Sequence, residues 1–307
     1  MRWLVTGGAG FIGSHLVDAI IARGLAEVTV LDSLSRGRRE HLARHAANPL
    51  LRIIEGDIRD ADAVGRACEG VEVVIHLAAR SNVMGSEVDV AAACETNVGG
   101  SVNVLDAALR AGVGRLVFSS SREVYGDPAS LPVAEETPFA PKNLYGASKA
   151  AGETYCGVYR RRGLDVRVLR LSNVYGLRDS ERVIPLWLAR AALAQPLEVF
   201  GGQQVLDLIW IDFVVEALLR AAAVESLAGP INVGSGKGVP ILALAEQVIA
   251  ATGSSSTTHL QPAREQEVLG YVADVARMRR DLGIEPPPEP LAYLATMVAA
   301  GAGAGAG

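Results

Sequence analysis

Short apolar runs, rich in leucine and β-branched residues, alternate with longer amphipathic stretches over the first part of the chain. Several runs are continuously apolar rather than alternating, which is typical of parallel strands covered on both faces. The pattern predicts strands at 3–6, 27–32, 51–55, 73–77, 115–119 and 166–171, and helices at 13–23, 61–68, 96–111 and 144–162. Such strand–helix alternation predicts an α/β fold with a doubly wound parallel sheet.

After about Leu171 this alternation gives way to shorter elements separated by prolines, which interrupt helices and central strands. We therefore expect two domains. The first spans 1–171 plus about 213–236 and regains the sheet near 231–234, and a smaller, interleaved C-terminal domain spans about 172–212 plus 237–298. Residues 299–307, where Ala and Gly alternate, are expected to form a flexible tail.

Composition narrows the classes of function. Of the 307 residues 50% are hydrophobic and 21% charged, and the net charge is −5, which excludes a disordered chain. Apolar stretches are cut by charges or glycines before a membrane span of about 20 residues is reached, and no basic stripe indicates nucleic-acid binding. Three cysteines (Cys68, Cys94 and Cys156) form no metal-ligand pattern. We expect no bound metal, no membrane or nucleic-acid partner, and a reducing, cytoplasmic location.

Glycines cluster where the first expected strand meets the first expected helix. The segment Gly7-Gly8-Ala9-Gly10-Phe11-Ile12-Gly13 allows a tight turn and brings pyrophosphate to a helix N-terminus. Asp32 ends the second expected strand, where a carboxylate binds the adenosine ribose and disfavours a 2′-phosphate. The pattern predicts NAD rather than NADP. Arg36, Arg38 and Arg39 favour NADP weakly, although a solvated basic loop is their commoner role.

Tyr145 and Lys149 stand four residues apart on an expected helix and so share one face. A phenol titrates near about 10, which is too high for a base at neutral pH. A neighbouring ammonium, together with a nicotinamide cation, lowers that pKa. Tyr145 is therefore a candidate base, and Lys149 is placed to hold the nicotinamide ribose as well.

Further motifs occur in one order along the chain: Gly56-Asp57-Ile58, His76-Leu77-Ala78-Ala79, Ser119-Ser120-Ser121, Val124-Tyr125-Gly126-Asp127, Tyr145-Gly-Ala-Ser-Lys149, Asn173-Val174-Tyr175-Gly176 and Trp210-Ile211-Asp212. With the glycine turn, they resemble the extended short-chain dehydrogenases/reductases, the NAD-dependent nucleotide-sugar epimerases and dehydratases. The resemblance covers residue 2 to about residue 284. It implies a Rossmann-type NAD domain, a UDP-sugar substrate, and a homodimer joined by the helices near 96–111 and 144–162.

The resemblance also implies roles for individual residues. Ser121 matches the hydroxyl that hydrogen-bonds the sugar O4, which makes Ser121, Tyr145 and Lys149 the catalytic set. The implied cofactor-binding residues are Gly7, Gly10, Phe11, Ile12, Gly13, Asp32, Arg36, Asp57, Ile58, Leu77, Ala78, Arg80, Asn97, Tyr145 and Lys149. The implied substrate-binding residues are Ser81, Ser121, Arg122, Glu123, Asn173, Arg182, Val183 and Arg264. His76 is expected to serve in packing.

Members of this family share an opening step in which the tyrosine takes the O4 proton while C4 gives hydride to NAD. The resulting 4-keto sugar is then epimerised, dehydrated or decarboxylated. Family dehydratases resemble Thr-Asp-Glu where this chain has Ser121-Arg122-Glu123, so dehydration lacks its acid at Arg122. Glu123 is compatible with a UDP-glucuronate decarboxylase or with a structural role. A UDP-sugar 4-epimerase is favoured, and UDP-glucuronate decarboxylase and NDP-glucose 4,6-dehydratase remain alternatives.

The positions of a few arginines bear on which sugar the substrate carries. Arg182 occupies a position where glucose/galactose epimerases resemble a neutral Asn, and a guanidinium there pairs bidentately with a C6 carboxylate. UDP-glucuronate and UDP-galacturonate are therefore favoured over UDP-glucose and UDP-galactose. Arg264 matches a diphosphate-binding Arg, whereas Leu206 replaces a second family Arg, for which Arg178 or Arg182 are candidate substitutes.

Two other classes of function remain open. The same fold also carries dinucleotide-binding regulators without catalysis, because function belongs to a site rather than to a fold. The intact set of Ser121, Tyr145 and Lys149 argues against that class. An NADP-dependent reductase with net turnover of cofactor is the other alternative.

Overall fold

A sheet of seven parallel strands forms the centre of the computed structural model, which describes residues 1–304. Its order is β10-β6-β5-β4-β1-β2-β3. The strands are β1 (Arg2–Thr6), β2 (Glu27–Asp32), β3 (Leu51–Glu55), β4 (Val73–His76), β5 (Arg115–Ser121), β6 (Val166–Leu171) and β10 (Ile231–Val233). The predicted doubly wound α/β fold is confirmed, with β5 two residues longer than expected and β4 one shorter.

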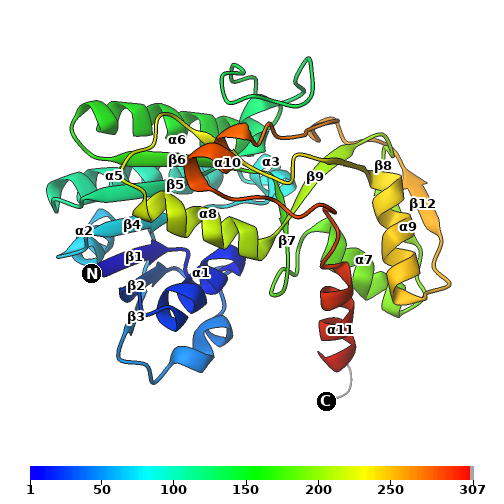
Figure 1. The fold of residues 1–307 in the computed structure, drawn as a ribbon, viewed down its shortest axis with the longest axis horizontal. Coiled ribbons are helices and arrows are strands. Elements are labelled where there is room, and N and C mark those ends of the chain that lie inside the picture. Colours follow the sequence, from blue (N-terminus) through cyan, green and yellow to red (C-terminus); the bar gives the residue numbers. More distant parts are fainter. Residues whose placement is uncertain (305–307) are drawn as a thin grey trace.

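Helices cover both faces of this sheet (Figure 1). On one face α1 (Phe11–Ala22) packs against α8 (Ile211–Ala223). On the other, α5 (Ser101–Arg110) contacts both α2 (Ala61–Cys68) and α6 (Leu144–Arg161). Alternate residues of β1 enter different cores, Trp3 and Val5 with α1 and α8, and Leu4 with the opposite helices. Burial on both faces explains why the strands are continuously apolar.

A second group of elements lies beside the main sheet, on the right of Figure 1. It contains a three-stranded sheet, β11-β9-β7, and a parallel pair, β12-β8. Its elements are β7 (Asn173–Tyr175), α7 (Val183–Ala192), β8 (Leu197–Phe200), β9 (Val205–Trp210), β11 (Gly238–Pro240), α9 (Ile241–Thr252), β12 (Thr258–Gln261) and α11 (Leu294–Ala304). The core beneath α1 and α8 continues into this group through Leu197, Val199 and Leu244.

Short helical turns complete the chain: η1 (Arg39–His45), α3 (Val83–Val88), α4 (Val90–Cys94), η2 (Glu95–Gly100), η3 (Arg122–Tyr125) and α10 (Ala276–Leu282). The expected single helix at 96–111 is interrupted, since η2 is a π-helical turn before α5. Close packing accompanies this turn, because a Cβ on Gly100 would lie 2.6 Å from the Ile58 side chain.

The end of the chain also differs from expectation. Residues 299–304 of the expected flexible tail continue α11 as helix, which the strong helix propensity of alanine favours. The remaining residues of that segment, 305–307, lie outside the described residues.

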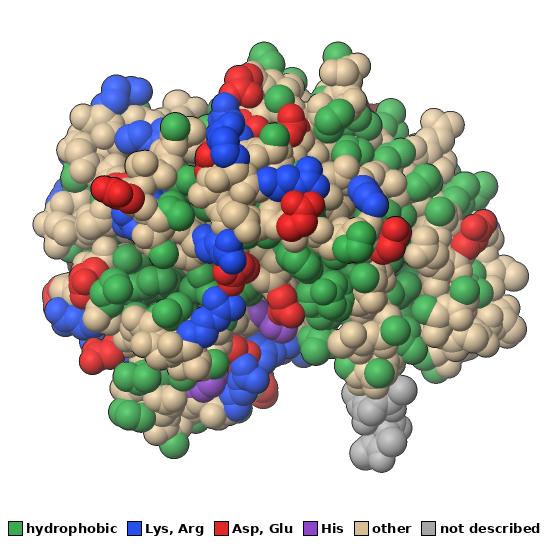
Figure 2. All heavy atoms as spheres, viewed as in Figure 1, with side chains coloured by type: hydrophobic (Ala, Val, Ile, Leu, Met, Phe, Trp, Pro, Cys, Tyr) green, Lys and Arg blue, Asp and Glu red, His purple; other side chains and the backbone are tan. Residues whose placement is uncertain are grey.

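The surface carries both signs of charge. Figure 2 shows Lys and Arg side chains interspersed with Asp and Glu over the half of this face that carries the main sheet. Among residues 1–304, no helix is both long and apolar enough to cross a membrane. Nor does this part of the chain bring three potential metal ligands together.

Candidate functional site

The glycine turn between β1 and α1 brings backbone close to backbone. Gly7 has a φ of +72°, and a Cβ there would lie 2.8 Å from the Ala78 amide nitrogen. A Cβ on Gly13 would lie 2.2 Å from the Gly7 carbonyl oxygen. Only glycine fits either position. The turn therefore presents the N-terminus of α1 without side chains in the way, as a phosphate-binding site requires.

Asp32 ends β2 beside this turn, as predicted. One carboxylate oxygen accepts a hydrogen bond from the Ala9 amide at 2.9 Å, and the other accepts from the Leu34 amide at 2.9 Å. These two contacts fix the direction of a largely buried carboxylate. The carboxylate faces the cavity described next and retains lone pairs for a diol.

One large cavity of about 1130 Å³ runs from the glycine turn to the second group of elements. All but one of the residues implied for the cofactor and substrate line it: Gly7, Gly10, Phe11, Ile12, Gly13, Asp32, Arg36, Asp57, Ile58, Leu77, Ala78, Arg80, Ser81, Ser121, Arg122, Glu123, Tyr145, Lys149, Asn173, Arg182, Val183 and Arg264. Residues far apart in the sequence thus share a single space.

Asn97 is the exception. It is buried outside the lining, where its side chain accepts from the Arg80 amide at 2.8 Å and donates to Ser148 Oγ at 3.0 Å. It also donates to the Arg80 carbonyl. Asn97 therefore holds the loop that carries Arg80, and its contact with the cofactor stays a prediction.

Ser121, Tyr145 and Lys149 meet where β5 ends and α6 begins. Asn143 caps α6 by accepting from the Gly146 amide at 2.8 Å, which places Tyr145 in the first turn. Lys149 is buried, donates to the Ser119 carbonyl at 2.8 Å, and lies 5.9 Å from the centre of the Tyr145 ring. Burial lowers the pKa of Lys149 to about 8.

The electrostatics of Tyr145 show what this site supplies without a ligand. The pKa of Tyr145 is raised to about 12, chiefly by burial and in smaller part by Glu123. Arg182 and the Ser121 hydroxyl oppose that rise. The phenol is therefore protonated at neutral pH, and it becomes a base only when additional positive charge enters the site.

Arg122 and Glu123 form a buried ion pair beside this set. Arg122 Nη2 lies 2.7 Å from one Glu123 carboxylate oxygen, and Asn143 Nδ2 donates to the other at 2.7 Å. Arg122 Nη1 is buried and has no hydrogen-bond partner among the described residues. Both Glu123 oxygens are therefore engaged, while Arg122 keeps a free donor.

Arg182 reaches the same region from the loop before α7. Its guanidinium carbon lies 5.2 Å from the centre of the Phe11 ring, and its Nη1 donates to Asp179 Oδ1 at 3.2 Å. The neighbouring Glu181 pairs with Arg36 from the loop after β2, and Arg36 also donates to Ser81. This Arg36–Glu181 bridge joins the cofactor side of the cavity to the other side.

The far end of the cavity combines cations and unpaired polar atoms. Arg264 lies over the Phe200 ring at 3.5 Å and ion-pairs with Glu267. Leu206 lines the wall, so no cation stands at that position. Arg178 is bound to Asp18 at 2.6 Å, which holds this candidate substitute toward α1. Asn173 Oδ1 is buried and without a partner in the described residues, as expected for a group that faces a ligand.

A protein-family model described as the NAD dependent epimerase/dehydratase family matches residues 3–234. This chain belongs to that family. Its NAD dependence agrees with the site, where the glycine turn would be filled by any Cβ and a fixed Asp32 ends β2. The residues present therefore fit NAD, with the pyrophosphate at the α1 N-terminus and the adenosine ribose at Asp32.

Relatives within this epimerase/dehydratase family differ in reaction. The chain is 35% identical over 294 residues to a UDP-glucose 4-epimerase of Mycolicibacterium smegmatis, which covers 93% of this chain and 94% of that protein. It is 32% identical to UDP-glucuronic acid decarboxylase 2 of Arabidopsis thaliana, over 93% of this chain and 65% of that protein.

The solved structure of DesIV, a dTDP-glucose 4,6-dehydratase from Streptomyces venezuelae with NAD bound, superposes with a TM-score of 0.93 and 35% identity. It covers 97% of this chain and 96% of that chain. Three reactions of one family thus occur at similar distance from this sequence.

Sequence reasoning missed residues that act through contact with the implied set. Asn143 is one, and its place just before the Tyr145 helix was a signal, because Asn is a preferred N-cap. Asp179 is another, and its opposite charge three residues before Arg182 was a signal for the pair. Gln204 lines the cavity with its Oε1 buried and unpaired within residues 1–304.

Proposed function

We propose that this family member is an NAD-dependent 4-epimerase of UDP-sugars that interconverts UDP-glucuronate and UDP-galacturonate. The observation that carries the proposal is the position of Arg182. It lies against Phe11, and it is the strongest of the groups that lower the pKa of Tyr145. Arg182 and Tyr145 line the same cavity, where a guanidinium would pair with a carboxylate at C6 of a sugar whose O4 meets Tyr145.

The reacting residues divide the work of the first step. Ser121 and Tyr145 hydrogen-bond the sugar O4, and Tyr145 takes its proton as the C4 hydride leaves. Lys149 supplies a positive charge one helical turn from Tyr145 and favours the phenolate. NAD, held by the glycine turn and Asp32, would supply the reversible hydride acceptor at C4. For an epimerisation, Tyr145 would then give the proton back to O4 once the sugar has turned its other face to the cofactor.

The pair formed by Arg122 and Glu123 supports epimerisation over dehydration. A dehydration needs an acid and a base beside the 4-keto sugar. Arg122 stays protonated in proteins and so is no acid; one Glu123 oxygen already accepts a hydrogen bond from Asn143, and the other lies in the ion pair with Arg122.

A 4-ketouronate is a β-keto acid and loses CO₂ when its carboxylate bond aligns with the carbonyl π-system. An epimerase acting on it must hold the carboxylate out of that alignment. A bidentate contact with Arg182 supplies such a hold, because the planar guanidinium fixes the carboxylate plane. Asp179 keeps Arg182 in place before substrate arrives.

Decarboxylation of UDP-glucuronate is the second candidate, and the place of Glu123 favours it. This buried carboxylate is close enough to Tyr145 to raise its pKa. If substrate binding draws Arg122 away, Glu123 becomes free to act on the keto acid.

Product analysis with UDP-glucuronate, UDP-glucose and dTDP-glucose in parallel tests the proposal. We expect UDP-galacturonate from UDP-glucuronate, identified by NMR, with its carboxylate retained and no net reduction of NAD. A pentose product would assign the decarboxylase, and a 4-keto-6-deoxy product the dehydratase. If no product forms although NAD is bound, the result would favour a dinucleotide-binding regulator. Net consumption of NADPH would favour a reductase.

We also propose the assignment of one ligand to each domain, and the homodimer, that are expected from the sequence. Residues 1–171 with about 213–236 would bind NAD, and about 172–212 with 237–298 the UDP-sugar. A homodimer would pair α5 and α6 with their copies, since Tyr155 and Val158 of α6 are exposed. Light scattering after size-exclusion chromatography distinguishes a dimer from a monomer.

A further inference from the structure

A chain of buried polar groups runs behind the catalytic helix, outside the cavity. It begins at Glu153, one turn after Lys149 on α6, and continues through Arg170 and Tyr125. None of these three lines the cavity. The reaction proposed above does not use them, yet their burial demands an explanation, because an isolated buried charge is costly.

Glu153 joins the catalytic helix to the strand that carries the catalytic serine. One of its carboxylate oxygens accepts a hydrogen bond from Ser120 Oγ and another from Arg170 Nε at 2.9 Å. The other oxygen lies 2.7 Å from Arg170 Nη2. Ser120 stands between Ser119, whose carbonyl receives Lys149, and Ser121. Glu153 therefore ties α6 to β5 next to the position where Ser121, Tyr145 and Lys149 meet.

Arg170 extends this set of contacts to the edge of the main sheet. Its Nη1 donates to the Tyr125 hydroxyl at 2.7 Å and to the Glu135 carbonyl at 2.8 Å. Tyr125 in turn donates to Asn232 Oδ1 at 2.7 Å.

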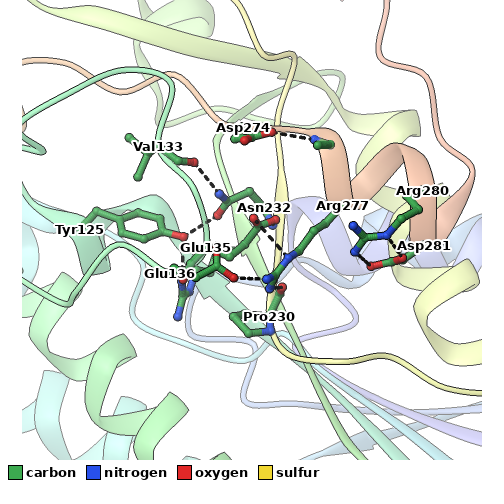
Figure 3. A network of polar contacts seen from close by, with 12 residues as sticks. Tyr125, Val133, Glu135, Glu136, Pro230, Asn232, Asp274, Arg277, Arg280 and Asp281 are labelled. Carbon is green, nitrogen blue, oxygen red and sulfur yellow. Dashed lines mark hydrogen bonds and ion pairs between the residues drawn. The ribbon is translucent and has the colours of Figure 1, made fainter.

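Figure 3 shows the outer end of the chain of contacts. The Asn232 amide donates to Glu135, and Arg277 of α10 approaches both Glu135 and Glu136 (Figure 3). Glu153 is therefore anchored through β6 and β10 as far as α10 and has little freedom to move.

We propose that Glu153 is a positioning residue for catalysis: it fixes α6 against β5 and supplies the negative charge that keeps Lys149 an ammonium ion. Stability alone is a weak reason for such a pair, since buried ion pairs often contribute little net free energy. The place of the carboxylate, one helical turn from Lys149, is the informative feature. The inference rests on the proposed role of Lys149 and not on which sugar is bound.

The charges around Lys149 give the expected direction of change. Burial lowers the pKa of Lys149 to about 8, whereas Cys156 and, to a smaller extent, Glu153 oppose that fall. The other facing groups do not titrate between about pH 6 and pH 10. The pKa of His76 on β4 is lowered to about 3 by burial, that of Tyr145 is raised to about 12, and that of the Cys156 thiol is raised by burial. Removing the Glu153 charge must lower the pKa of Lys149 further.

The test is the affinity for NADH, followed by its fluorescence between about pH 6 and pH 10. We expect wild-type affinity to fall about tenfold as Lys149 loses its proton, because one charge-assisted hydrogen bond to the ribose is lost. In Glu153→Gln the pH at the midpoint of this fall in affinity should be lower by about half a pH unit or more. NADH binding needs no sugar, so this result is independent of the product analysis above.

Glu135→Gln is the matched control, since it removes a similarly buried carboxylate of the same chain of contacts without facing Lys149. Its midpoint should equal that of the wild type. An unchanged midpoint in Glu153→Gln, or an equal shift in Glu135→Gln, overturns the proposal.

If Glu153→Gln does not fold, Ser120→Ala tests the contact with β5 separately. It keeps the charge and removes one tether, so the midpoint should stay while NADH binds about threefold more weakly at pH 7. Unchanged affinity in Ser120→Ala would contradict the positioning role.

Discussion

The two halves of the cavity are built in different ways. The half assigned to the cofactor is centred on backbone, namely the glycine turn and the ends of β1, β2 and β4, with charged side chains such as Asp32 and Asp57 around it. The other half contains charged side chains from three separate segments, and each side chain pairs with a neighbour in its own segment: Arg122 with Glu123, Arg182 with Asp179, and Arg264 with Glu267.

This difference explains how one family keeps one cofactor and changes its reaction. The glycine turn forms a backbone cradle with no room for substitution at Gly7 or Gly13, because a Cβ at either position collides with main-chain atoms. A set of paired side chains changes its charge with one substitution and leaves the fold intact. The relatives agree with this, since an epimerase, a decarboxylase and a dehydratase all match over most of this chain.

Gly13→Ala should have the largest effect, because it breaks the backbone cradle. The new Cβ would lie 2.2 Å from the Gly7 carbonyl, so the turn must shift by about an ångström, enough to cost at least about 100-fold in affinity. NADH titration measures the loss. Gly65→Ala is the control, since a Cβ there meets no atom within 4 Å. Equal affinities in the two variants would contradict a rigid cradle.

Arg182→Ala should change specificity in the other half and leave NADH binding intact. We expect kcat/KM for UDP-glucuronate to fall about 10- to 100-fold as a bidentate contact is lost, and activity with UDP-glucose to stay within about threefold. Steady-state kinetics with both sugars give the answer. Arg264→Ala should weaken both sugars alike, because every UDP-sugar carries the diphosphate. Unchanged kinetics with UDP-glucuronate in Arg182→Ala would remove the basis for the uronate assignment.

His76 gives the cofactor half a pH dependence of its own. It is buried between Thr6 and Ser101, and burial lowers its pKa to about 3 from the ordinary 6.5. Between these values the unfolded chain binds the extra proton, so stability falls as pH decreases below about 6.5, by roughly 1.4 kcal/mol per pH unit. The free energy of unfolding, measured with urea, should fall with this slope in the wild type but not in His76→Asn. His259→Asn, at an exposed site, should retain it.

Glu181→Gln should have the smallest effect, because it weakens the one bridge between the halves that we describe. Arg36 and Glu181 are 39% and 49% exposed, so their pairing contributes about 1 kcal/mol or less. NADH should dissociate up to about fivefold faster in stopped-flow measurements. Glu285→Gln, which loses a similarly exposed pair with Arg279, should leave the rate unchanged. Equal rates in all three proteins would mean that the bridge does not retain cofactor.

Local pattern was sufficient to predict the main sheet and the cradle. Buried parallel strands are continuously apolar, and the glycine turn, Asp32 and the pair Tyr145 and Lys149 are each marked within a few neighbouring residues. The π-helical turn at 95–100 escaped prediction because nothing in the local pattern distinguishes it from the helix that follows. The contacts of Gly100 with Ile58 and of Asn97 with Arg80 were equally absent from that pattern, because the partners come from other segments.

The charged half resisted prediction for a related physical reason. The sequence shows Glu123 but not that Asn143 and Arg122 occupy both of its oxygens. It shows Arg264 but not the Phe200 ring beneath it. Which partner a charged side chain meets depends on the tertiary fold, so roles in this half came from resemblance to a family and remain proposals.

The apolar core beneath α1 and α8, which runs without a break from Trp3 to Leu197 and Leu244, limits how the molecule can move. Opening by rotation of two rigid bodies would expose that shared interior to water. We therefore expect ligands to enter without rotation of one group of elements against the other. The same continuity predicts that the main sheet and the elements beside it unfold together, in one cooperative transition.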